Sequence, residues 1–300
     1  MIDALVFSKD RAMQLDAVLR SLRLHCRDAH LLATTVLYTV SNDTHARHYA
    51  QLAREHPGVH FLEEKDFKAD MLSLVKPGRF LLFLVDDNIF VREFSLEDAV
   101  DQLQATPQAL AFSLRLGRNT SYCYMLAKYQ KLPKFDEVRN GVLSFDWTTS
   151  ERDFGYPFDV SSSIYRTSDM LPLLERVPFS NPNTLEGRLG GIKGDMGEKN
   201  VLLCFDQSVT FTNPINKVQS ILPNNRSGKR KRYAPTHLSE MFEEGYRINV
   251  ETFSNFVPKS CQQEVKLRFA HPDEDSLKKR TVWQRWFSRL FFAKSRQTEK

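Results

Sequence analysis

The segment 79–90 constrains the fold of this chain more than any other. Six apolar residues in succession are followed directly by Asp86, Asp87 and Asn88, and then by two more apolar residues. A short continuous apolar run is typical of a strand buried on both faces of a parallel sheet. The polar residues then lie at the carboxyl end of the strand, where open α/β sheets bind their ligands. Carboxylate and amide oxygens suit Mg²⁺ or Mn²⁺, so these three residues are our candidate metal ligands.

The composition is that of an ordinary globular protein. The chain has 300 residues, of which 41% are apolar, enough for one large α/β domain or two small ones. No apolar run approaches the 18 or so residues of a membrane-spanning helix, and the N-terminus does not resemble a signal peptide. The four cysteines are scattered without a C-x-x-C pair, which predicts reduced thiols in a cytosolic protein.

The net charge of +5 is unevenly distributed along the chain. Residues 276–300 carry +7 and residues 226–232 carry +5, so the remainder of the chain carries −7. An acidic body with two short basic segments argues against a broadly basic nucleic-acid surface. We therefore expect no nucleic-acid partner.

Apolar periodicity in the first 115 residues alternates between the strand and the helix pattern. It predicts strands at 4–7, 31–40, 59–62, 80–85 and 109–114, and helices at 10–25, 45–55, 66–75 and 95–104. Such alternation predicts a Rossmann-type α/β fold with a mostly parallel sheet. Beyond residue 116 the pattern becomes irregular and aromatic. There we expect a strand at 158–166, a helix at 168–174, a loop entering a helix at 181–188 and a strand at 201–211.

The order of these segments resembles the glycosyltransferases of the GT-A fold, in particular the family 2-like enzymes of bacterial surface-polysaccharide assembly. Ser8 and Arg11, after the first strand, resemble the segment that cradles the nucleotide base, and Asp43 resembles the next base or ribose contact. Asp86 and Asp87 resemble the metal-binding DxD motif. The resemblance implies a nucleotide-sugar-binding half at 1–115, an acceptor-binding half of the same domain at 116–272, and a separate tail at 273–300.

The resemblance also implies roles for individual residues. Glu186, near the start of a predicted helix, is the preferred catalytic base, and Asp159, Asp146 and Asp153 are alternatives beside an aromatic segment that is suited to stacking an acceptor sugar. The candidate donor-binding residues are Ser8, Arg11, Asp43, Asp70, Asp86, Asp87, Asn216 and Lys217. Many family members have an aspartate where this chain has Asn88, so the implied Mn²⁺ or Mg²⁺ is held less strongly here. Lys217 or the basic segment 229–232 is the alternative partner of the diphosphate.

The tail has its own pattern. Residues 281–292 place large aromatic and aliphatic side chains along one helical stripe, with Lys and Arg beside it. A basic amphipathic helix too short to span a bilayer is typical of an interfacial helix on an anionic leaflet. A helix docked on the chain's own domain or on a second subunit is the alternative.

These observations together predict a glycosyltransferase on the cytoplasmic face of the cell membrane. The donor is expected to be a UDP-sugar and the acceptor a glycan or a lipid-linked glycan. A sugar nucleotidyltransferase remains an alternative, although the segment 7–11 lacks the glycines that such enzymes carry after their first strand. A non-catalytic, membrane-associated scaffold is the alternative outside enzymes.

Overall fold

A computed structural model describes residues 1–139, 141–218, 228 and 231–271 of the chain. The predicted tail helix lies outside these residues, as does most of the basic segment 226–232. Within the described part, no helix is both long enough and apolar enough to cross a bilayer.

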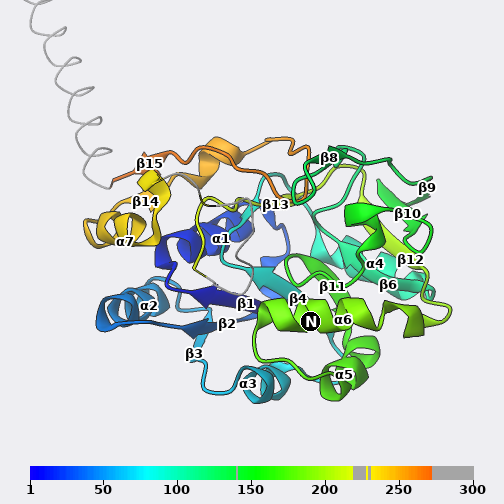
Figure 1. Cartoon of the computed structure of the whole chain (residues 1–300), viewed down its shortest axis with the longest axis horizontal. Helices are drawn as coiled ribbons and strands as arrows, with labels where there is room; N and C mark the ends of the chain where they lie inside the picture. Colours follow the sequence, from blue (N-terminus) through cyan, green and yellow to red (C-terminus); the bar gives the residue numbers. More distant parts are fainter. Residues whose placement is uncertain (140, 219–227, 229–230, 272–300) are drawn as a thin grey trace, which may run out of the picture.

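A nine-stranded sheet runs through the centre of the molecule (Figure 1). Across the sheet the strands are β3 (His60–Glu63), β2 (Leu32–Thr39), β1 (Ile2–Lys9), β4 (Phe80–Val85), β11 (Ser163–Arg166), β6 (Ala109–Ser113), β12 (Val201–Phe205), β10 (Val142–Asp146) and β9 (Asp136–Arg139). The pairings make seven of these strands point one way, while β11 and β10 point the other way. The predicted α/β fold with a mostly parallel sheet is therefore confirmed.

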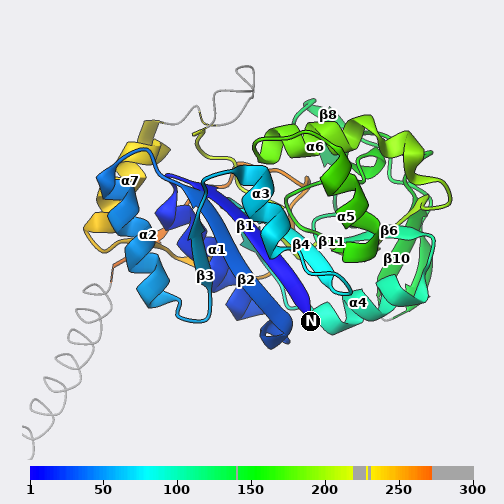
Figure 2. The ribbon, with the colours of Figure 1, turned by 90° about the horizontal axis from the view of Figure 1, so that it is seen from below.

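The helices cover both faces of this sheet (Figure 2). They are α1 (Ala12–His25), α2 (Asp43–Glu55), α3 (Phe67–Leu74), α4 (Leu96–Ala105), α5 (Thr167–Arg176), α6 (Pro182–Gly191) and α7 (Pro235–Glu243). Side chains of a strand alternate between its two faces, so Ala4 and Val6 join one core while Leu5 and Phe7 join the other. The first core also contains residues of α1, α2, α4 and α7, and the second contains residues of α3, α5 and α6. The result is a three-layer arrangement with a buried central sheet.

Two strand predictions in the second half were wrong in extent. The run 201–211 forms two strands, β12 and β13 (Thr210–Thr212), because the chain leaves the large sheet at Asp206 and pairs with β5 (Asn88–Phe90). The run 158–166 forms a strand only from Ser163 onward, because the Asp159 carboxylate accepts hydrogen bonds from Ser161 and Ser163 and shapes the preceding segment.

Two further short strand pairs lie outside the large sheet. The hairpin of β7 (Tyr122–Cys123) and β8 (Lys128–Tyr129) belongs to the irregular aromatic segment. β14 (Arg247–Ile248) pairs with β15 (Phe269–Ala270), at the side of the molecule where α7 also lies (Figure 1).

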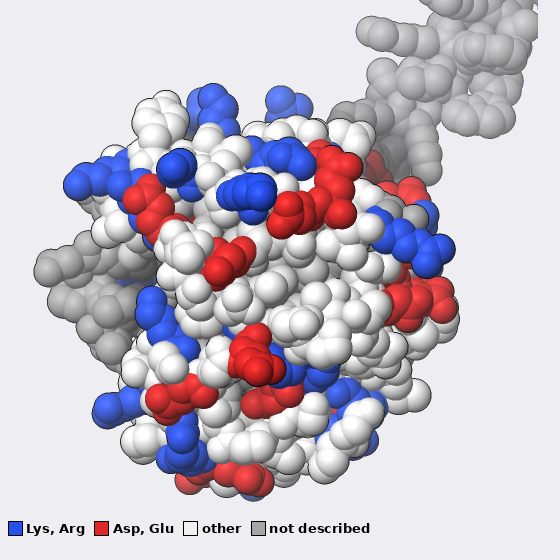
Figure 3. All heavy atoms as spheres, turned by 90° about the vertical axis from the view of Figure 1, so that its right-hand side faces the viewer, with Lys and Arg blue, Asp and Glu red and all other residues white. Residues whose placement is uncertain are grey.

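The face at the right-hand side of Figure 1, where β9 and β10 lie, mixes charges of both signs. In the described part of this face, Lys and Arg side chains lie close to Asp and Glu side chains in the upper and lower parts of the view, and a largely uncharged area lies between these parts (Figure 3). Because opposite charges lie close together, the field of this face is weak.

Candidate functional site

The carboxyl ends of β1 and β4 lie side by side, because the two strands are parallel neighbours in register from Ile2 and Phe80. This pairing brings Ser8 and Arg11 to Asp86. The Asp86 carboxylate accepts hydrogen bonds from Ser8 Oγ at 3.0 Å, from the Lys9 backbone N–H at 3.1 Å and from Arg11 Nη1 at 2.9 Å. Both oxygens of Asp86 are therefore engaged in holding the end of β1.

Asp87 is held much less firmly than Asp86. Its side chain is 12% exposed, and its contact with Arg11 Nη1 is 3.5 Å long. Burial, together with repulsion from Asp86, raises the pKa of Asp87 to about 6, although the charge of Arg11 opposes the shift. One arginine faces two carboxylates, so the cluster carries an excess negative charge when both are ionised.

Arg11 joins this cluster to a distant part of the chain. Its Nη2 donates to the Asn216 carbonyl at 2.8 Å. The Asn216 side chain exchanges two hydrogen bonds with the Gln14 amide, at 3.2 and 3.1 Å, and donates a third to the Tyr233 carbonyl. The segment that carries Asn216 and the half-buried Lys217 therefore lies against the start of α1, beside the two aspartates.

Asn88 has a structural role, so the structure does not support it as a metal ligand. Its Oδ1 accepts a hydrogen bond from the Val85 N–H at 2.8 Å, and its Nδ2 donates to the Ser161 carbonyl at 2.8 Å. The residue is completely buried in β5. A short polar side chain directly after a strand serves a turn as readily as a ligand site.

The remaining donors nevertheless fit a divalent cation. Asp87 is a hard oxygen donor with a single long contact and a surplus of negative charge around it. Mg²⁺ and Mn²⁺ are commonly held by one or two carboxylates, with substrate phosphates and waters completing the shell. The Asp87 carboxylate is an oxygen donor of the kind that this chemistry uses, and Asp86 pairs with Arg11 beside it.

A second charged cluster centres on Arg115. Its Nε lies 3.3 Å from Asp159 Oδ2, and its Nη1 donates to Ser161 Oγ at 3.1 Å. Asp159 is 3% exposed, and it also accepts hydrogen bonds from Ser161 and Ser163. Because its oxygens are engaged in this way, the structure does not support Asp159 as the catalytic base.

Glu186 lies at the edge of the Arg115 cluster. It is half-buried in α6, a helix that begins with a capping box of Asn181 and Thr184. Burial, with a smaller contribution from Asp159, raises its pKa to about 7, while Arg115 opposes the shift. A carboxylate with a pKa near neutrality is suited to accept a proton at physiological pH.

Val160 and Ser161 link the Asp86–Asp87 segment to Glu186. Asn88, next to Asp87, donates to the Ser161 carbonyl, and the neighbouring Val160 N–H donates to Glu186 Oε1 at 3.4 Å. The metal-ligand candidate and the base candidate are therefore connected through two adjacent residues.

The other candidate residues have different surroundings. Asp43 is exposed in the first turn of α2, next to Ser41, whose N–H donates to Asp10. Asp70 accepts the backbone N–H groups of the two residues that precede α3, so its carboxylate serves that turn.

Asp146 and Asp153 are also engaged locally. Asp146 accepts hydrogen bonds from the N–H and hydroxyl of Thr148, which lower its pKa and close the turn after β10. Asp153 accepts a hydrogen bond from Gln130 Nε2 at 3.1 Å. The structure does not support Asp146 as a base, because a lowered pKa makes it a poor proton acceptor. Trp147, which belongs to the aromatic segment expected to stack an acceptor sugar, is 5% exposed, and its indole N–H donates a hydrogen bond to the Lys199 carbonyl.

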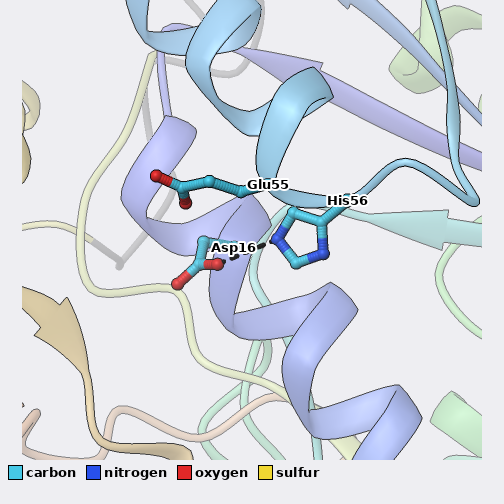
Figure 4. Close-up of side chains that lie close together, drawn as sticks. All are labelled: Asp16, Glu55 and His56. Carbon is cyan, nitrogen blue, oxygen red and sulfur yellow. Dashed lines mark hydrogen bonds and ion pairs between the residues drawn. The ribbon is translucent and has the colours of Figure 1, made fainter.

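A third group of acidic and imidazole side chains is a structural network. Asp16, Glu55 and His56 lie close enough to share a metal ion, and Figure 4 shows His56 pointing toward Asp16. However, Asp16 bonds to Arg20 at 2.8 Å and to His56 at 3.0 Å, and Glu55 bonds to Arg247 at 3.0 Å. Arginines already neutralise both carboxylates, so this group ties α1 and α2 to the segment around β14.

Arg115 is the residue that the sequence interpretation missed. It follows the predicted strand 109–114 directly, in the same position relative to its strand as Asp86 has to β4. Ligands of open α/β sheets bind at the carboxyl ends of the strands. This rule points to Arg115 as readily as it points to Asp86 and Asp87.

No family model matches the chain. Among curated proteins it is similar to the bifunctional glycosyltransferase pgtA of Dictyostelium discoideum, with 28% identity over 186 residues. The match covers 56% of this chain and 24% of that protein, so the chain spans about a quarter of the length of its relative. The resemblance to glycosyltransferases that the motif order predicts is thereby confirmed.

Solved structures of similar layout have low TM-scores. S. aureus TarS 1-349 in complex with UDP-GlcNAc is 13% identical, has a TM-score of 0.48, and is matched over 74% of this chain and 60% of that one. The mannosyltransferase PcManGT from Pyrobaculum calidifontis, in complex with GDP-Man and Mn²⁺, is 15% identical and has a TM-score of 0.38. That match covers 57% of this chain and 46% of the mannosyltransferase.

Proposed function

We propose that this chain is a glycosyltransferase that moves a sugar from a nucleoside diphosphate sugar to a glycan or lipid-linked glycan. The observation that carries the proposal is the cluster of Arg11, Asp86 and Asp87 at the carboxyl ends of two parallel strands. Ligands of α/β sheets bind at this edge, and the excess negative charge there suits a cation that accompanies a diphosphate. The similarity to a glycosyltransferase over 186 residues supports the same class of reaction.

Each side chain of the donor site has a separate task in this proposal. Asp87 holds Mn²⁺ or Mg²⁺, and such a cation supplies positive charge that stabilises the leaving diphosphate. Asp86 and Ser8 fix Arg11 and the end of β1, so that this wall of the donor site is rigid before the donor binds. Lys217, in the segment that Arg11 holds, adds a cation for the diphosphate, and Asp43 contacts the nucleoside.

Glu186 is the proposed general base. It takes the proton from the attacking acceptor hydroxyl while the bond between sugar and diphosphate breaks. Support comes from its raised pKa of about 7 and from its contact with Val160, one residue from the carbonyl that Asn88 binds.

A calorimetric titration tests the donor site. UDP, GDP, CDP and dTDP are titrated into the wild type, each with and without Mn²⁺, and UDP is expected to bind tightest. Asp87→Ala should weaken the Mn²⁺-dependent part of the affinity at least tenfold, which corresponds to about 1.4 kcal/mol. Asp101→Ala, which removes an exposed carboxylate from α4, is the matched control and should leave the affinity unchanged.

The titration also has outcomes that contradict the proposal. Failure of all four nucleotides to bind would remove the glycosyltransferase assignment. Equal nucleotide affinity with and without Mn²⁺, in both the wild type and Asp87→Ala, would contradict the metal role of Asp87. Arg11 and Lys217 would then be the partners of the diphosphate.

A further inference from the structure

A groove of about 530 Å³ lies outside the donor site, between the β7–β8 hairpin and the segment 259–264. This volume falls in the range of about 300–1,000 Å³ that is typical of small-molecule sites. Neither cluster of charged residues described above contributes a side chain to its wall. The residues that line the groove are therefore different from those proposed here for the two charged clusters.

Aromatic rings form one wall of the groove. Tyr122, Tyr124 and Tyr129 line it. The ring centroids of Tyr122 and Tyr129 are 5.4 Å apart, and the angle between the two ring planes is 75°. Tyr129 is 77% exposed. Such a ring offers an apolar face to a ligand while its hydroxyl stays in water.

The opposite wall is polar. It includes Lys259, Gln262 and Glu264, and Tyr124 donates a hydrogen bond from its hydroxyl to Glu264 Oε1 at 2.8 Å. An amide, a carboxylate, an ammonium group and hydroxyls together donate and accept hydrogen bonds in several directions. A pyranose ring has an apolar C–H face and a rim of hydroxyls, so it matches an aromatic wall opposite a polar one.

The backbone connects this groove to the proposed metal ligand. The Gln263 N–H donates to the Thr212 carbonyl at 2.9 Å in β13, and the next residue, Asn213, donates from its N–H to the Asp87 carbonyl at 2.8 Å. The Asn213 side chain also exchanges hydrogen bonds with the backbone of Val265. The polar wall of the groove is thus fixed to the same strand that lies beside Asp87.

We propose that the groove is a carbohydrate subsite that binds the acceptor glycan, with a sugar ring stacked on Tyr129 and its hydroxyls bonded to Glu264 and Gln262. This inference rests on the proposed function for the acceptor role. The binding of a sugar in the groove is a separate claim and can be measured without any donor.

Saturation-transfer NMR on the full chain tests the binding. The probes are the methyl glycosides of glucose, galactose, mannose and N-acetylglucosamine, together with lactose and cellobiose. At least one of them should bind, and Tyr129→Ala should weaken its affinity about fivefold to tenfold. Leu126→Ala is the matched control, because Leu126 is 58% exposed in the same hairpin and does not line the groove.

Tyr129 is largely exposed, so its replacement leaves the core intact, and a thermal unfolding curve verifies this for each variant. No saturation of any probe at about 20 mM would overturn the inference. Equal affinity of the wild type and Tyr129→Ala would overturn it as well, because the sugar would then bind elsewhere.

A parallel nucleotide titration separates this inference from the proposed function. Tyr129→Ala should bind nucleotide as the wild type does, because Arg11 and Asp87 do not line the groove. Nucleotide binding without sugar binding would reject the groove alone. Sugar binding in the groove without nucleotide binding would reject the acceptor role.

Discussion

At the scale of single residues, Asp86 and Asp87 have opposite effects on stability although they are neighbours. Asp86 forms the short ion pair with Arg11, so Asp86→Asn should lower the free energy of unfolding by about 3 kcal/mol. The folded-state pKa of Asp87 is raised to about 6, above the value of about 4 in an unfolded chain. Its ionisation therefore destabilises the fold as the pH rises from 4 through 6, and Asp87→Asn should stabilise the protein by about 1–3 kcal/mol at pH 7.

Urea unfolding of both variants at about pH 4.5 and pH 7.5 measures these effects. The gain from Asp87→Asn should be present at the higher pH and shrink at the lower one. A loss of stability at pH 7.5 as large as that of Asp86→Asn would contradict this interpretation of Asp87.

Glu186 gives a prediction for the rate of transfer. Its raised pKa of about 7 means that the carboxylate form, which the proposed base needs, develops as the pH rises through neutrality. The pH profile of kcat/KM should therefore rise and reach a plateau above about pH 8. Glu186→Gln should lower the rate by about 10²–10⁴ and leave nucleotide affinity unchanged. Glu175→Gln, which changes an exposed glutamate of α5, should behave as the wild type. A normal rate in Glu186→Gln would exclude it as the base.

The pattern of the sequence predicts the positions of these residues better than their roles. Asp86 and Asp87 lie at a sheet edge because they follow an apolar run, and this is visible in the sequence. The division of labour between them, and the burial of Asn88, depend on Arg11 and Ser161, which come from distant segments. The spacing of residues along the sequence does not show which distant side chains will contact one another in the fold.

At the scale of elements, α4 begins with two caps in place of one. Ser95 caps it in the usual way, and Asp28 accepts the N–H groups of Leu96 and Glu97 at 2.8 Å each. Burial opposes the ionisation of Asp28, but these N–H groups outweigh burial and lower its pKa. Asp28→Ala should therefore destabilise the protein by about 1–2 kcal/mol at neutral pH.

Chemical unfolding at a series of pH values verifies the second cap. Because the folded pKa of Asp28 is lowered, its contribution is present above about pH 4 and declines as the pH falls below that value. Asp28→Asn keeps an acceptor without the charge and should lose less stability than Asp28→Ala. If the difference in unfolding free energy between the wild type and Asp28→Ala stayed constant down to about pH 3, the effect would come from packing and not from the charge of Asp28.

Elements with local signals were predicted well, and those that depend on distant partners were not. Asn42, Asp66 and Ser95 cap the helices that follow them, and each cap is readable from the sequence. β13 was merged with β12 because its partner β5 lies in a distant segment, and the β7–β8 hairpin was missed because its strands have only two residues each. Amphipathic alternation is weak in strands as short as two or three residues.

At the scale of the whole molecule, the two halves expected from the sequence interleave in one sheet. β11, from the second half, lies between β4 and β6 of the first, and β12 extends the sheet beyond β6. β11 pairs with Phe80, Leu81 and Leu82 of β4, the strand that Asp86 directly follows. The proposed donor site therefore lies at the edge of a sheet to which both expected halves contribute strands.

The distribution of charge over the whole chain gives the last prediction, which concerns the membrane. Residues 276–300 carry +7, and Trp283, Trp286 and Phe287 lie among these charges, whereas the chain outside the two basic segments carries −7. We propose that this tail attaches the protein to an anionic bilayer, since aromatic and basic residues in one short segment favour the interface of such a bilayer.

The full chain should sediment with vesicles that contain phosphatidylserine and should be released by high salt, while a chain that ends at Pro272 should stay in solution. Trp286→Ser should weaken binding without changing the charge, which separates insertion from simple attraction. Equal binding of the full and the shortened chain would show that the tail has no such role.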